Sequence, residues 1–124
     1  MKEQLILFET AKLAKEKGFD EPSDTYVTKG DKYETEEGAF FKNSYGFITA
    51  PTQFLLQKWL REEHNIYIEV GLNFNDKFHV AVYNRNYKEV LDTIKNKIFL
   101  DSSNDLKTYE EALEQGLIEA LKLV

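Results

Sequence analysis

The sequence of 124 residues contains no cysteine. This absence excludes a disulfide framework and thiolate metal sites, and it fits a reducing cytoplasm. A chain of this length does not need such cross-links, because a domain of this size can bury a hydrophobic core. Its 42% hydrophobic and 31% charged residues are typical of a globular protein.

Long hydrophobic runs are also missing. Near the N-terminus the apolar run Leu5 to Phe8 is followed at once by charged residues. A signal peptide needs a longer apolar stretch and a small-residue cleavage site, and a membrane-spanning helix needs a far longer one. We therefore expect a cytoplasmic protein that does not enter a membrane.

Clusters of basic residues are absent as well. The chain has 22 acidic and 16 basic residues, which give a net charge of -6. Binding of duplex nucleic acid depends on clustered lysine and arginine, so the sequence disfavours that partner. It leaves open a protein partner or self-association.

Motifs for catalysis and metal binding are not found. The two histidines, His64 and His79, match no zinc-binding spacing, and the glycines form no phosphate-binding cluster. The segment Asp101 to Asp105 lacks the glycine and the distal glutamate of a calcium loop. We predict no catalytic residue, no metal site and no cofactor. The alternative is a small hydrolase or metal-dependent enzyme that uses His64 or His79 with nearby carboxylates.

Three segments have the composition and terminal signals of helices: residues 3–17, 50–65 and 108–124. Gly18 is a natural terminator for the first helix, and Phe19 is expected to pack back on it. Thr108 and Glu111 form a capping box at the start of the last helix. The 3.6-residue period predicts that Trp59 lies on the buried face of the second helix.

Gly116 lies in the middle of the last predicted helix, where glycine costs about 1 kcal/mol relative to alanine. Periodicity places it on the apolar face of that helix, with Glu114 on the opposite face. A glycine on a buried face lets a bulky group approach the helix backbone. We predict that this group is Trp59.

The clearest strand signal is strict alternation over residues 66–83. Its even-numbered positions are apolar: Ile66, Ile68, Val70, Leu72, Phe74, Phe78, Val80 and Val82. This pattern predicts a hairpin with one buried face. A three-residue loop, Asn75 to Lys77, would align all these residues on that face, so we predict that loop.

Weaker signals lie on either side of this hairpin. A small hairpin with its turn at Gly30-Asp31 is predicted near residue 30, and Ile98 to Leu100 could pair with the central hairpin. A short helix is predicted around Val90 to Ile94. The aromatic segment Tyr26 to Phe47 leaves open an alternative function in binding single-stranded nucleic acid, although glutamates interrupt its lysines.

Together these elements predict a single α+β domain over residues 1–124. A small antiparallel sheet is built on the central hairpin, with about three helices, two of them packed on its even-numbered face.

The odd-numbered face of the hairpin is the predicted interaction surface. It carries Tyr67, Glu69, Gly71, His79, Ala81 and Tyr83. In the predicted register Gly71 lies opposite Ala81, which makes a shallow dip floored by small residues and rimmed by aromatic ones. Tyrosine-rimmed surfaces suit protein partners. The alternative is that another element of the same chain packs into this dip.

Three stretches of the sequence stand out together: "LAKEKGFDEP", "APTQFLLQKWLREEHNIYIEV" and "YEEALEQGLIEALKLV". They resemble a group of small uncharacterised phage- and prophage-related proteins of gut Bacteroidetes. The resemblance implies a mobile-element origin and lends no catalytic residues. Our first functional hypothesis is a non-enzymatic, phage-related protein that acts through protein–protein contacts.

Overall fold

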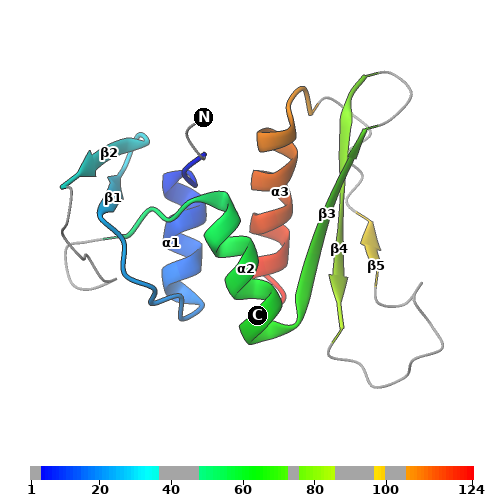
Figure 1. Ribbon diagram of the computed structural model, residues 1–124, viewed down its shortest axis with the longest axis horizontal. Helices are drawn as coiled ribbons and strands as arrows, with labels where there is room; N and C mark the ends of the chain where they lie inside the picture. Colours follow the sequence, from blue (N-terminus) through cyan, green and yellow to red (C-terminus); the bar gives the residue numbers. More distant parts are fainter. Residues whose placement is uncertain (1–3, 37–47, 73–75, 86–96, 100–105) are drawn as a thin grey trace. The chain divides into compact units, whose positions relative to one another are not determined.

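The computed structural model describes residues 4–36, 48–72, 76–85, 97–99 and 106–124 (Figure 1). The chain divides into two compact units, Met1–Leu56 and Gln57–Val124, and each is described by itself. Helices and antiparallel strands are both present, so the predicted α+β class is confirmed. No helix in the described ranges is long and apolar enough to cross a membrane.

In the first unit, helix α1 is Phe8–Glu16, which begins later than predicted. The preceding residues are extended, because the Ile6 N–H donates to the Pro51 carbonyl at 3.1 Å. The predicted end of the helix is confirmed. Gly18 has a φ of 95°, and the Phe19 N–H turns back to the Ala14 carbonyl at 2.9 Å.

Strands β1 (Thr25–Thr28) and β2 (Lys32–Thr35) form an antiparallel hairpin. Its turn contains Gly30 and Asp31, with φ values of 88° and 58°, as the sequence predicted. Residues 48–50 run along the other side of β1, where the Val27 N–H donates to the Ile48 carbonyl at 2.9 Å.

Helix α2 is Gln53–His64, and the division between the two units falls within it. The Thr52 hydroxyl caps its N-terminus by accepting a hydrogen bond from the Leu55 N–H at 3.1 Å. Trp59 is buried, as the period predicted, and so are Leu56 and Leu60.

The second unit contains strands β3 (Ile66–Leu72), β4 (Phe78–Asn84) and β5 (Lys97–Phe99). All pairings are antiparallel, and the order is β3-β4-β5. The prediction that a strand near Ile98 pairs with the central hairpin is confirmed.

The register of the central hairpin differs from the prediction by two residues. Val70 lies opposite Val80, so the even-numbered apolar residues do share one face. Leu72 lies opposite Phe78, however, so the connection runs from residue 73 to residue 77 and the predicted three-residue loop was wrong. Alternation has a period of two, so a shift by two residues leaves the same side chains inside.

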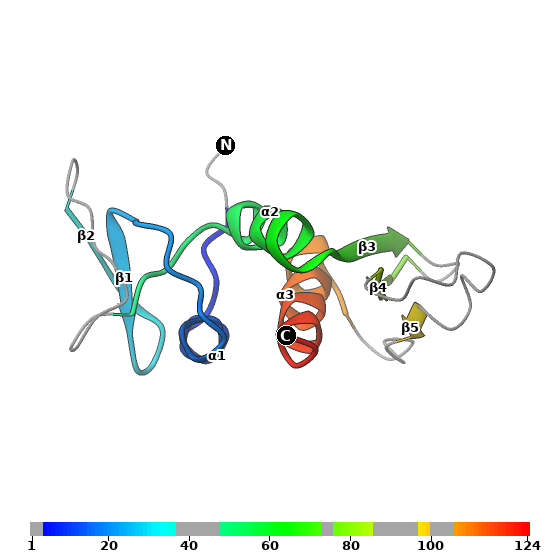
Figure 2. The same ribbon diagram turned by 90° about the horizontal axis from the view of Figure 1, so that it is seen from below.

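Helix α3, Tyr109–Leu121, packs against both β3 and β4 (Figures 1 and 2). Gly116 is buried, as predicted, but Trp59 was the wrong neighbour. A Cβ atom added at Gly116 would lie 2.6 Å from Cγ2 of Val80 and 2.8 Å from Cγ2 of Ile68. The glycine therefore brings the helix onto the hairpin.

The predicted capping box of α3 is also present. The Thr108 hydroxyl accepts a hydrogen bond from the Glu111 N–H at 3.1 Å. The Glu111 carboxylate accepts one from the Lys107 N–H, also at 3.1 Å. Two free amides at the helix start are thereby satisfied.

Three predictions fall on residues outside the described ranges. They concern the short helix around Val90 to Ile94, the aromatic residues Phe40 to Phe47, and the segment Asp101 to Asp105.

Candidate functional site

The six residues of the predicted interaction surface lie on the odd-numbered face of β3 and β4. This set, Tyr67, Glu69, Gly71, His79, Ala81 and Tyr83, is called the tyrosine face below. The observed register pairs them differently from the prediction. Tyr67 lies opposite Tyr83, Glu69 opposite Ala81, and Gly71 opposite His79.

The predicted dip at Gly71 is filled. A Cβ atom added at Gly71 would lie 2.5 Å from both Cε1 and Nε2 of His79, so the imidazole ring lies directly over the glycine. Ala81, the other predicted floor residue, is only 3% exposed. The prediction of a hollow between these two residues was therefore wrong, because the two-residue shift replaces Ala81 by His79 opposite Gly71.

The two tyrosines form the centre of this face. Both are half-buried and directly opposed on neighbouring strands. The Tyr83 hydroxyl donates to Oε2 of Glu69 at 3.2 Å, and the Arg85 guanidinium lies 5.6 Å from the centroid of the Tyr67 ring. A guanidinium at that distance makes a cation–π contact.

Arg85 also belongs to this surface, although it was not among the predicted residues. Its odd number continues the series that ends at Tyr83, and that signal could have found it. The structure fixes its backbone through Asn65, which adopts a φ of 57° after α2. The Arg85 N–H donates to the Asn65 carbonyl at 3.0 Å, and the Asn65 side-chain amide donates to the Arg85 carbonyl at 3.0 Å.

The histidines of the enzyme alternative each make a structural contact. The His64 ring meets the Trp59 ring edge-on, with 4.5 Å between centroids. His79 covers Gly71. Within the ranges that the structure describes, no group of three histidine, aspartate or glutamate residues could hold a metal ion.

A second exposed group lies where the central hairpin meets the start of α3. Leu72 is 59% exposed and lies opposite Phe78, whose ring meets the Tyr109 ring edge-on at 6.2 Å between centroids. Tyr109 is 46% exposed. These three residues are called the tip cluster, and large apolar groups exposed together often mark contact sites.

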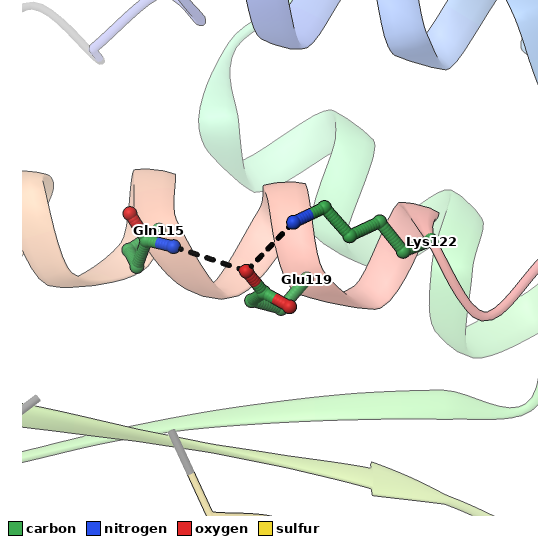
Figure 3. Close-up of polar contacts among 3 residues, drawn as sticks. All are labelled: Gln115, Glu119 and Lys122. Atoms are coloured by element: carbon green, nitrogen blue, oxygen red, sulfur yellow. Dashed lines mark hydrogen bonds and ion pairs between the residues drawn. The ribbon is translucent and has the colours of Figure 1, made fainter. Parts of the chain in front are cut away.

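On α3, Gln115, Glu119 and Lys122 interact with one another (Figure 3). Oε1 of Glu119 accepts a hydrogen bond from the Gln115 amide at 3.3 Å and pairs with the Lys122 ammonium at 3.0 Å. Glu114, predicted to lie opposite the apolar face, is instead buried at 7% exposure.

Together these features define a small α+β protein with an aromatic hairpin face. No protein-family model, no curated protein and no solved structure matches the chain.

Proposed function

We propose that this protein is non-enzymatic and acts through protein–protein contacts made by the tyrosine face. The observation that supports the proposal is the opposed, partly exposed pair Tyr67 and Tyr83, flanked by Arg85. Tyrosine and arginine are enriched among the residues that contribute most to binding at interfaces.

The side chains of this face are held in place by contacts with one another, and this supports the same proposal. Tyr83 is held by Glu69, and Arg85 rests on Tyr67 while Asn65 holds its backbone. Side chains that are already ordered lose less conformational entropy when a partner binds, so a larger share of the contact energy remains as affinity.

The resemblance to phage- and prophage-related proteins supplies a context for the proposal. We propose a partner in the cytoplasm of a gut Bacteroidetes host, encoded by the host or by the phage. This choice decides which lysate is used in the test.

The test compares proteins retained from such a lysate by three immobilised chains: wild type, a Tyr67→Ala/Tyr83→Ala double variant, and Phe54→Ala. Phe54 is a matched control, because it is 58% exposed and lies outside the tyrosine face. We expect wild type and Phe54→Ala to retain the same protein and the double variant to lose it.

A melting curve for each variant, followed by circular dichroism, shows that the loss does not come from unfolding. If all three chains retained the same protein equally well, the tyrosine face would not be the binding surface.

A further inference from the structure

Strand β3 forms an edge of its sheet. Among the described strands, β4 is its only neighbour, and β5 pairs on the far side of β4 (Figure 2). An edge strand presents backbone N–H and C=O groups that can pair with another chain.

The hydrogen bonds show which residues of β3 point outward. The Arg85 N–H donates to the Asn65 carbonyl, so odd-numbered pairs bond to each other across the hairpin. In an antiparallel ladder the residues between them direct their N–H and C=O away from the partner strand. The Ile68 carbonyl confirms this direction, because it accepts a hydrogen bond from the Gln57 side chain at 3.2 Å.

The open stretch of this edge is therefore Val70 to Leu72. In the described part of the chain, no group bonds to the outward N–H or C=O of either residue. Gln57 covers the edge only at Ile68. No proline lies in β3, so the usual block to strand addition is missing here.

The side chains beside this stretch differ on the two faces of the sheet. The tip cluster of Leu72, Phe78 and Tyr109 is apolar and partly exposed. On the other face, Glu69 is exposed and negatively charged. An added strand would meet an apolar surface with one set of alternate side chains and a carboxylate with the other.

We propose that an extended segment of a partner protein adds to the sheet as a β-strand along Val70 and Leu72. Its backbone bonds to their outward groups, an apolar side chain contacts the tip cluster, and a lysine or arginine lies beside Glu69. This mode of binding takes affinity from the backbone and specificity from alternate side chains. It rests on the proposed function, since it names the kind of partner.

Charge favours a basic partner over a second copy of this chain. The chain has a net charge of -6, and antiparallel pairing of two copies through β3 about Val70 would make their Glu69 carboxylates diagonal neighbours on one face of the sheet. Like charges on neighbouring strands destabilise pairing, whereas opposite charges stabilise it.

The experiment selects binders to the full chain from a random library of linear peptides about ten residues long, the upper length of an ordinary strand. We expect enriched peptides to alternate apolar and polar residues, with lysine or arginine at a polar position. Leu72→Pro should weaken their binding on the order of tenfold or more, because it removes an outward N–H. The ladder with β4 is kept, because the Leu72 N–H points away from it.

Glu69→Lys is the second variant and does not depend on how Leu72→Pro folds. It should weaken the basic peptides while circular dichroism remains that of the wild type. Tyr67→Ala/Tyr83→Ala separates this proposal from the proposed function, because it removes the tyrosine face and leaves Val70, Leu72 and Glu69 in place.

Three outcomes would overturn the strand-addition proposal. The first is selection that enriches no alternating peptide. The second is peptides lost from the double tyrosine variant but bound equally by Leu72→Pro and Glu69→Lys, which would leave the proposed function standing. The third is a dimer of the wild type, seen by light scattering and abolished by Leu72→Pro, which would make a second copy the occupant.

Discussion

At the scale of single residues, Asp31 has a role that its place in a turn does not reveal. Helix α1 has no side-chain cap of its own at Leu7. The Phe8 N–H is instead bonded by Oδ1 of Asp31, in the turn between β1 and β2, at 2.8 Å. A carboxylate at a helix N-terminus satisfies a free amide and complements the helix dipole.

Replacing Asp31 by glycine should therefore destabilise the protein by a few tenths of a kcal/mol to about 1 kcal/mol, the range for losing a capping side chain. Glycine tolerates the φ of 58° at this position, so the variant removes the carboxylate without backbone strain. Urea denaturation measures the change. Asp20→Gly, at another exposed position before β1, is the control, and an equal loss in both variants would contradict the cap.

Gly116 is the second residue whose replacement has a definite expected sign. Gly116→Ala would place a methyl group 2.6 Å from Val80 Cγ2. Overpacking of this kind costs about 1–3 kcal/mol, and we expect it to exceed the roughly 1 kcal/mol that alanine gains in helix propensity. Thermal unfolding should show a lower melting temperature.

Combining Gly116→Ala with Val80→Ala gives the control, since the second change removes the nearer of the two methyl groups that the first one meets. The double variant should lose less stability than the sum of the single changes. Strict additivity would mean that the two residues do not meet.

At the scale of elements, the passage from α2 to β3 depends on Asn65. Its left-handed backbone ends the helix, and its side-chain amide bonds to the Arg85 carbonyl. Asn65→Gly should lose only the side-chain bond, while Asn65→Ala should also incur a backbone strain of about 1–2 kcal/mol. Chemical denaturation should rank the stabilities as wild type, glycine and then alanine, and a reversed order of the two variants would contradict the left-handed role.

Hydrogen exchange along β3 gives a second prediction for an element. The amides of Tyr67, Glu69 and Gly71 face β4 and should exchange slowly. The amides of Val70 and Leu72 face outward and should exchange faster than these neighbours. Uniform protection along the strand would mean that something covers the edge, and nuclear magnetic resonance can follow each amide separately.

Some features of the helices and strands could be predicted from the sequence alone. Local signals identified the C-terminal end of α1 and the start of α3, since Gly18 and the pair Thr108 and Glu111 act next to those helix ends. Alternation identified which face of the central hairpin is buried. It could not determine the two-residue shift, because both registers bury the same side chains. The hollow predicted on the tyrosine face is absent because of that shift in register.

Contacts between segments that are distant in the chain could not be predicted from the sequence, for a related reason. Nothing local to Asp31 points to Phe8, and nothing local to Gly116 selects Val80 over Trp59. Helical periodicity gives the direction in which a residue faces, and tertiary packing decides what it meets.

At the scale of the whole molecule, the boundary between the two compact units lies inside α2. The single-domain organisation therefore remains a prediction with a direct test. A helix cannot lose part of its length without weakening the rest, because helix formation is cooperative. We expect the units to unfold in one transition.

Trp59 makes that test simple, since it is the only tryptophan and lies in the second unit. Its fluorescence reports that unit, whereas far-ultraviolet circular dichroism reports helices of both. The two urea transitions should coincide. Separated midpoints would show two independently folding units.

The imidazole lying over Gly71 ties two positions on different strands to one another. Any larger residue at position 71 would push that ring aside and reshape the surface next to the tyrosines. Evolution can therefore change one of these positions freely only when the other changes with it. In descendants of this chain, a bulkier residue at 71 should be accompanied by a smaller one at 79.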